Sequence, residues 1–172
     1  MGIDKSFVPF NGRPMIEIVK EQVTGLGSET ILISNKQDSY VNLDLPIFSD
    51  IYPDSGPLGG IFTALKASRY THVLVVACDM PWLNRQLLQY LVSLKDSADV
   101  IVPRWDKFPE PLHAIYNKSC CAPIEKCIKA GKLKITGFFA DVRVCFVDQE
   151  EIVRYDPQGR SFTNVNTPED LQ

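Results

Sequence analysis

Short apolar runs alternate along the chain with longer segments in which apolar residues recur at helical spacing. The runs predict β-strands, because β-branched and aliphatic residues favour a pleated, buried surface. They lie at 30–34, 45–48, 72–78, 99–102, 112–116 and 142–147. The run at 72–78 is apolar in every residue after the first, which is typical of a parallel strand that helices cover on both faces.

The segments between these runs predict helices at 14–26, 57–65, 83–94 and 119–130. Pro57 stands in a first turn, where helices favour proline, and Gly27 and Gly131 stand where glycine commonly ends a helix. Thr167 and Pro168, with acidic residues after them, predict a further helix start at 167–171.

Strand and helix alternate over the whole length, without a repeat, a low-complexity tract or a linker. A chain of 172 residues can bury one substantial core. We therefore predict a single domain over residues 1–172, an α/β fold of three layers with a Rossmann-like, mostly parallel sheet. In such sheets, ligands bind beyond the carboxyl ends of the strands.

The net charge of −3 and the sequence pI of about 5.4 argue against nucleic acid or an anionic membrane as a partner. The longest apolar run is too short to cross a bilayer, and the amino terminus lacks a secretory pattern, so we expect a cytoplasmic protein. The five cysteines lack the paired spacing of a zinc site, which predicts reduced, mostly buried thiols.

Asp79 is the strongest candidate for chemistry, because it follows the most apolar of the predicted strands. A carboxylate in that position would lie at the carboxyl edge of the sheet, where a metal-nucleotide complex would bind. The alternative is that Asp79 caps the next helix, for which Asn84 is better placed. His113 is interpreted as a structural residue.

Three further segments contain weaker signals. The segment 55–60, Ser-Gly-Pro-Leu-Gly-Gly, places glycines around a helix start, which suits either an anionic ligand or a simple turn. Lys5 could neutralise phosphate charge or be an ordinary surface residue. Asn164 and Asn166 would point to the same side of an extended chain, which turn chemistry alone does not explain.

Taken together, four segments resemble the molybdenum cofactor guanylyltransferases, the molybdopterin-guanine dinucleotide biosynthesis protein A family. They are Met-Gly-x-Asp-Lys with Asn-Gly-x-Pro at 1–14, Ser-Gly-Pro-Leu-Gly-Gly at 55–60, Cys-Asp-Met-Pro at 78–81, and Asn-Val-Asn-Thr-Pro-Glu-Asp-Leu at 164–171. The resemblance spans nearly the whole chain, and it implies a fold of the nucleotide-diphosphosugar transferase type.

The resemblance also implies an activity: transfer of GMP from GTP to molybdopterin, with Mg²⁺ as cofactor and pyrophosphate as the second product. Its partners would include proteins that mature molybdenum enzymes. It implies that Lys5 contacts the GTP phosphates and that Asp79 holds Mg²⁺. The nucleotide-binding residues that it implies are Asn35, Asp50, Gly56, Pro57, Leu58 and Gly59, with Asn164 and Asn166 near the metal or the acceptor.

One feature of the family has no counterpart in this sequence. The family's phosphate loop, Leu-x-Gly-Gly-x-Ser-x-Arg after a central strand, would come directly before Met1. We therefore expect the chain to be an amino-terminally shortened form. Loss of the central strand would expose unpaired backbone and core surface, which a partner chain could cover.

Two alternatives stay open. The first is a cytidylyltransferase of the same fold, acting on molybdopterin or on a sugar-alcohol phosphate, although Asn-Val-Asn-Thr-Pro favours the guanylyl family. The second is a non-catalytic protein that binds the cofactor or a nucleotide, which the missing phosphate loop favours.

Overall fold

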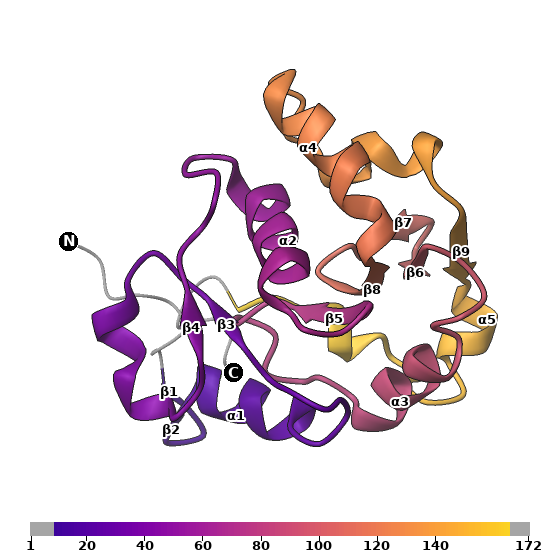
Figure 1. Cartoon of the computed structure of the whole chain (residues 1–172). Helices are drawn as coiled ribbons and strands as arrows, with labels where there is room; N and C mark the ends of the chain where they lie inside the picture. Colours follow the sequence, from indigo (N-terminus) through magenta and orange to yellow (C-terminus); the bar gives the residue numbers. More distant parts are fainter. Residues whose placement is uncertain (1–8, 166–172) are drawn as a thin grey trace.

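Helices lie on both sides of the strands in this computed structural model, which describes residues 9–165 (Figure 1). The helices are α1 (Met15–Val23), α2 (Gly56–Ala67), α3 (Arg85–Ser93), α4 (Cys121–Lys129) and α5 (Gln149–Ile152). The strands are β1 (Pro9–Phe10), β2 (Arg13–Pro14), β3 (Leu32–Ile33), β4 (Ile47–Phe48), β5 (His72–Val76), β6 (Val100–Trp105), β7 (Phe108–Pro109), β8 (His113–Asn117) and β9 (Val144–Val147). Short 3₁₀ segments lie at Gln37–Leu43, Lys118–Cys120, Ile135–Asp141 and Arg160–Phe162. The predicted α/β class is confirmed.

The main sheet has the order β5-β8-β6, with β7 and β9 also paired to β6. β8 runs antiparallel to both of its neighbours, whereas β9 is parallel to β6. β3 and β4 form a separate parallel pair, and β1 and β2 a small antiparallel hairpin. In the described main sheet, β5, β6 and β9 therefore point the same way, and the sheet differs from the predicted, mostly parallel one in the reversed direction of β8 and the short β7.

A hairpin explains this difference. β6 turns directly into β7 at Asp106 and Lys107, both of which have positive φ angles of 46° and 71°. Such a two-residue turn reverses the chain, and the short stretch from Trp105 to His113 leaves no room for the helical crossover that a parallel strand requires.

Alternate residues of the sheet face two separate cores. Val100 and Val102 pack with α2 and α4, whereas Ile101, between them, packs with α3 and α5. β8 follows the same rule, with Tyr116 on the first side and Ile115 on the second. Period-2 alternation with both faces apolar is what a sheet between two helical layers requires.

Helix ends confirm most of the predicted boundaries within a few residues. α2 begins with Pro57 in its first turn, and Gly131 follows α4 with a φ of 69°, as expected for a glycine that ends a helix. α1 is shorter than predicted, and Gly25, with a φ of 77°, takes the place expected for Gly27. The helix start predicted at 167–171 lies outside the described residues.

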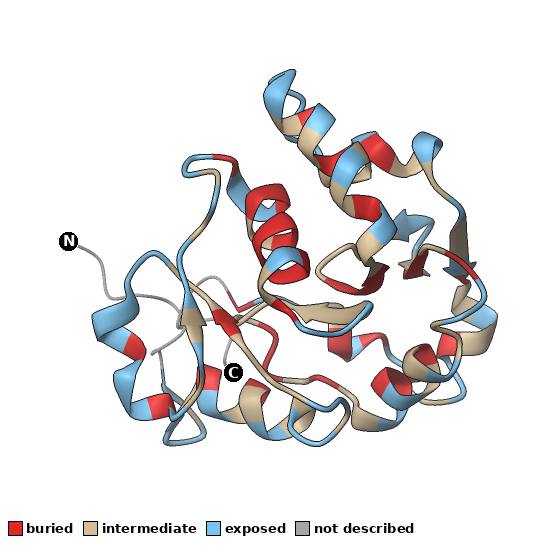
Figure 2. Cartoon of the chain, viewed as in Figure 1, coloured by how far each residue is buried: buried red, intermediate tan, exposed pale blue. Residues whose placement is uncertain are grey.

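β5 is less buried than the sequence predicted. All five of its residues are only half-buried, although the apolar run predicted a strand covered on both faces (Figure 2). β5 pairs with β8 on one side, and the other side borders a cavity. Among the described strands, β8 alone pairs with β5, and the strand is partly exposed where it borders the cavity.

Among the described helices, none is both long enough and apolar enough to cross a membrane.

Asn84 caps α3, as the sequence indicated. Its side-chain oxygen accepts hydrogen bonds from the backbone N–H groups of Gln86 (2.9 Å) and Leu87 (3.1 Å), and its Nδ2 donates to the carbonyl of Tyr155 (2.8 Å). We predict that Asn84→Ala lowers the free energy of unfolding by about 1–2 kcal/mol, because the cap and the bond to Tyr155 are lost together. Urea denaturation measures the difference.

The exposed side chain of Gln86 provides the matched control in the same turn. Gln86→Ala should change the free energy of unfolding by less than about 0.5 kcal/mol. Equal stability of both variants would show that the cap contributes nothing.

Candidate functional site

Asn35 and Asp50 meet just beyond the ends of β3 and β4. Asn35 Nδ2 donates to Asp50 Oδ2 at 3.0 Å, and the backbone N–H of Asp50 donates to Asn35 Oδ1 at 2.8 Å. The pairing follows from the register, since Ile33 lies opposite Phe48 in a parallel ladder and each polar residue comes two positions later. Two residues that the sequence suggested separately thus form one polar unit.

The same unit lies beside the first turns of α2. Asp50 Oδ1 is buried and has no hydrogen-bond partner within the described chain. The backbone N–H of Ile51 donates to Thr63 Oγ1 of α2 at 3.0 Å, which holds the segment against the helix. Asp50, Gly56, Pro57 and Gly60 all line one cavity of about 780 Å³. Asp50 therefore combines a buried carboxylate oxygen that has an unused acceptor with a position on the wall of this cavity, next to a helix amino end.

The residues at the start of α2 have different structural roles. Gly56 has a φ of 56°, a conformation that favours glycine, and it is exposed together with Pro57. Leu58 is fully buried in the core, so its side chain is not available to a ligand. Gly59 packs against the preceding loop, where a Cβ would come within 2.9 Å of Ser55 Cβ. Only the first two residues and the backbone can contact a ligand.

Asp79 lies in the turn that follows β5 and is half-exposed rather than buried in the core. Its backbone carbonyl accepts a hydrogen bond of 2.9 Å from the N–H of Val165. This bond brings the exposed Asn164 next to the turn, so two segments that the sequence singled out are neighbours. Since Asn84 caps α3, the alternative role of Asp79 as a helix cap is excluded.

Comparison with known proteins identifies the family. The model of the MobA-like NTP transferase domain matches residues 1–142. The chain belongs to this family. It therefore contains a nucleotidyltransferase domain, as the resemblance implied.

Relatives of the MobA-like family cover nearly the whole chain. This chain is 34% identical to a probable molybdenum cofactor guanylyltransferase of Pelotomaculum thermopropionicum, over 99% of this chain and 83% of the relative. It is 33% identical to a protein of the same description from Natranaerobius thermophilus, over 100% of this chain and 87% of the relative.

Solved structures confirm the predicted nucleotidyltransferase type of fold. Molybdopterin-guanine dinucleotide biosynthesis protein A from Archaeoglobus fulgidus matches with a TM-score of 0.84 at 28% identity, over 99% of this chain and 88% of that one. A 4-diphosphocytidyl-2C-methyl-D-erythritol synthase from Anaerococcus prevotii matches with a TM-score of 0.70 over 99% of this chain and 88% of that one. At 17% identity, this second likeness concerns the fold alone.

The donor chemistry at Asp79 fits the Mg²⁺ ion that membership of the MobA-like family suggests. Mg²⁺ is usually held by one or two carboxylates together with substrate phosphates and water, rather than by an all-protein cage. Within residues 9–165, the Asp79 carboxylate has no hydrogen-bond or ion-pair partner, and no group of three or more His, Cys, Asp or Glu side chains could hold a metal. Such a site would bind the ion together with a nucleotide.

Sequence reasoning gave no role to Glu110, which lies between β7 and β8 and whose backbone N–H donates to the carbonyl of Pro103 at 2.9 Å. The register pairs Val76 with His113, and the backbone N–H of Ala77 still donates to the carbonyl of Leu112 at 3.1 Å. Burial raises the pKa of Glu110 to about 7. The only signal for Glu110 is the strand register, which the sequence does not reveal.

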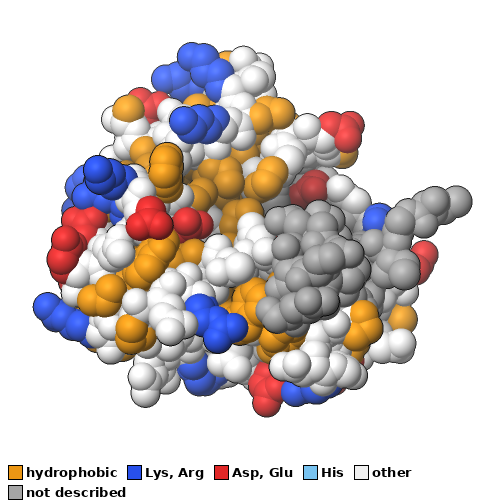
Figure 3. Space-filling model, turned by 180° about the vertical axis from the view of Figure 1, so that it is seen from behind, with side chains coloured by type: hydrophobic (Ala, Val, Ile, Leu, Met, Phe, Trp, Pro, Cys, Tyr) orange, Lys and Arg blue, Asp and Glu red, His pale blue; other side chains and the backbone are white. Residues whose placement is uncertain are grey.

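Two predicted residues, Lys5 and Asn166, lie outside the described part of the chain. On the side of the molecule shown in Figure 3, lysine and arginine side chains are interspersed with aspartate and glutamate.

His113 is buried within the sheet, and neither of its ring nitrogens has a hydrogen-bond partner in the described residues. Its ring packs edge-on against Phe162, with centroids 5.0 Å apart. Burial lowers the pKa of His113 to about 4, although the charge of Asp156 partly opposes this effect. These contacts agree with the structural role that the sequence suggested.

We predict that His113 makes the fold sensitive to acid. The unfolded chain takes up a proton near pH 6.5 and the folded chain only near pH 4, so stability is full above pH 6.5 and is lost as the pH falls toward 4. The loss amounts to about 3 kcal/mol. In His113→Phe the free energy of unfolding, measured by urea denaturation across this range, should depend less on pH by that amount.

The protein contains only one other histidine, His72, which serves as the control. His72→Gln should keep the acid sensitivity of the original chain. An unchanged pH dependence in His113→Phe would contradict the assignment.

Proposed function

We propose that the chain transfers GMP from GTP to the terminal phosphate of molybdopterin. An oxygen of the acceptor phosphate attacks the α-phosphorus of GTP, the bond between the α- and β-phosphates breaks, and pyrophosphate leaves. The product is the guanine dinucleotide form of the cofactor. The proposal is supported by the names of the relatives and by one feature of the site: the bond from Val165 to Asp79, which joins two of the four motifs.

The proposed reaction needs no general base, because a phosphate oxygen is already ionised near neutral pH. The protein must orient two anions and neutralise charge at the α-phosphorus. Mg²⁺, when bound, supplies part of that positive charge. We assign its binding to Asp79 and the neutralisation of phosphate charge also to Lys5.

We assign nucleotide binding to the part of the site that borders the cavity, beside β3, β4 and the start of α2. The Asn35–Asp50 unit offers an amide and an unused carboxylate oxygen, which suit the N–H and O–H donors of a nucleoside. The exposed amino end of α2 offers backbone N–H groups and the positive end of the helix dipole to phosphate oxygens. We assign Asn164 and Asn166 to the binding of the acceptor or of the metal.

Ligand-dependent thermal unfolding tests the choice of nucleotide. GTP with Mg²⁺ should raise the melting temperature, with a stabilisation of about 2.7 kcal/mol at a ligand concentration one hundred times Kd. CTP with Mg²⁺ should have a much smaller effect. A preference for CTP would contradict the proposal and indicate a cytidylyltransferase. Binding of GTP without release of pyrophosphate in the presence of molybdopterin would indicate a non-catalytic protein.

Substitution of the proposed metal ligand tests the mechanism. Asp79→Asn keeps the size of the side chain but removes its charge, and we predict that pyrophosphate release falls at least about 100-fold. Melting temperature without ligand should stay close to that of the original chain, because the carboxylate is half-exposed and bonds to no described residue.

Asp96→Asn is the matched control, because Asp96 is exposed and lies beside His72 at the opposite end of β5. It should keep full activity. Near-normal turnover in Asp79→Asn would remove this residue from the site.

A further inference from the structure

The turn that holds Asp79 lies alongside the last described segment of the chain. The N–H of Val165 donates to the carbonyl of Asp79 at 2.9 Å, and Ser161 Oγ donates to the carbonyl of Trp82 at 3.4 Å. The later residue of one segment thus meets the earlier residue of the other, so the two segments are antiparallel neighbours. Arg160, whose side chain is exposed, stands at the start of the second segment.

Ser161 fixes the backbone next to Arg160. It is fully buried, its N–H donates to Asp156 Oδ2 at 2.7 Å, and its Oγ accepts from the N–H of Asn84 at 3.1 Å. Together with the bond to Trp82, these contacts hold Ser161 in place from three sides. The arginine side chain therefore extends from a fixed point of the backbone.

The guanidinium group of Arg160 lies over the ring of Trp82, with Cζ 5.3 Å from the ring centroid. The ring of Phe10 packs edge-on against the same tryptophan, with centroids 5.1 Å apart. Contact between a guanidinium group and the face of an aromatic ring is attractive, and it leaves the N–H donors unused. Within residues 9–165, Arg160 has no hydrogen-bond or ion-pair partner.

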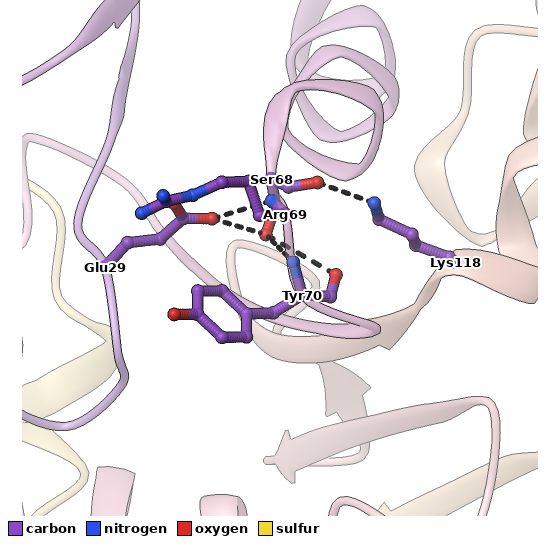
Figure 4. A network of polar contacts seen from close by, with 5 residues as sticks. All are labelled: Glu29, Ser68, Arg69, Tyr70 and Lys118. Carbon is purple, nitrogen blue, oxygen red and sulfur yellow. Dashed lines mark hydrogen bonds and ion pairs between the residues drawn. The ribbon is translucent and has the colours of Figure 1, made fainter.

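An arginine near the other end of β5 is, by contrast, paired within the chain (Figure 4). Glu29 accepts hydrogen bonds from Ser68 Oγ (2.9 Å) and from the backbone N–H (2.8 Å) and Nε (3.0 Å) of Arg69. Lys118 Nζ donates to the carbonyl of Ser68 at 2.6 Å. This bridge at Glu29 joins the segments that precede β3 and β5, and protein groups satisfy its charges. Arg160 differs, because no described carboxylate neutralises it.

A phosphate monoester is a suitable ligand for such a cation. It carries a charge of about −1.5 to −2 near neutral pH, and a planar guanidinium group can donate two parallel hydrogen bonds to its oxygens. Stacking on a ring restricts the arginine before the ligand arrives, which lowers the entropy cost of binding. The carboxylates of Asp50 and Asp79 repel an anion, so a phosphate that binds near them needs a compensating cation.

The position of Arg160 favours the phosphate of the acceptor over those of GTP. Asp50, Gly56 and Pro57, to which we assign the nucleotide, line the cavity, and its lining residues along β5 end at Cys78. Arg160 does not line this cavity. Phosphoryl transfer requires the attacking and leaving oxygens to lie roughly in line across the phosphorus. An acceptor that approaches from the side of Arg160 meets this requirement.

We propose that Arg160 binds the phosphate of the acceptor, with Trp82 as the ring that positions its guanidinium group. The ligand class is a phosphate monoester, and the oxygen that attacks GTP belongs to the same phosphate. This inference rests on the proposed function and deepens it, because it names a residue that recognises the second substrate.

Steady-state kinetics with Mg²⁺, GTP and molybdopterin test the proposal. Arg160→Ala should raise the KM for molybdopterin about 10–100-fold, because charge-assisted hydrogen bonds to phosphate are lost, and should change the KM for GTP less than about twofold. Arg160→Lys keeps the charge without the planar group and should show a smaller rise. An unchanged KM for molybdopterin in Arg160→Ala, or an equal rise in the KM for GTP, would overturn the proposal.

Arg154→Ala is the matched control. Arg154 is exposed on the same stretch of chain, but its charge acts on Tyr90 of α3 rather than on the turn that holds Asp79. Both KM values should stay as they are in the original chain. A comparable rise of the KM for molybdopterin in this variant would reduce the effect to net charge and would also overturn the proposal.

A binding measurement separates failure of this inference from failure of the proposed function. Trp82 is one of two tryptophans in the chain, so its fluorescence should report an anion bound at Arg160. Titration with glycerol phosphate at constant ionic strength should give a saturable change in emission, which Arg160→Ala abolishes and Arg154→Ala keeps.

The outcomes of this titration are distinct. If the original chain shows the change but releases no pyrophosphate from GTP, the phosphate site at Arg160 is supported and the proposed reaction fails. If there is no saturable change, or if Arg160→Ala shows the same change, the assignment of Arg160 fails whatever the activity of the chain.

Discussion

The packing of α2 against strands of both sheets holds the described structure together. One face of the helix contacts β3, of the parallel pair, and β5, of the main sheet. Leu58, Phe62 and Leu65 are buried in the largest core cluster, and burial of each such side chain contributes about 1.5–3 kcal/mol. Because β3 and β5 have no direct ladder between them, this helix and the bridge at Glu29 set their relative position. Thr63 of the same helix accepts a hydrogen bond from the N–H of Ile51, the residue after Asp50, so the geometry of the site depends on this helix.

The sequence predicted elements well where the local pattern was sufficient. The apolar run at 72–78 is a strand, and Pro57 and Gly131 mark helix ends as expected. The pairing partners were not predictable in the same way, because an apolar strand looks alike in a parallel and an antiparallel sheet. The hairpin that decides the direction of β8 turns at Asp106 and Lys107, which lack the Asn-Gly or Asp-Gly signature of such turns.

The candidate site shows the same division between local and non-local information. Asn35 and Asp50 were suggested one by one, but their mutual hydrogen bonds arise from the register of two strands, in which Ile33 lies opposite Phe48. Glu110 had no sequence signal at all, since its position depends on the ladder between β5 and β8. Leu58 shows the converse, because a residue within a glycine-rich motif can belong to the core.

Asn84 links two parts of the molecule that the chain order separates. One end of its amide holds the first turn of α3, and the other end holds Tyr155, ten residues before the segment that bonds to Asp79. Along that stretch, the backbone N–H of Ser161 donates to Asp156 Oδ2, and Ser161 Oγ in turn accepts from the N–H of Asn84. The segment 155–165 therefore cannot detach from the rest of the molecule independently of α3. Its detachment would also break the cap of α3, so this segment and the first turn of α3 should exchange their amide hydrogens as one cooperative unit.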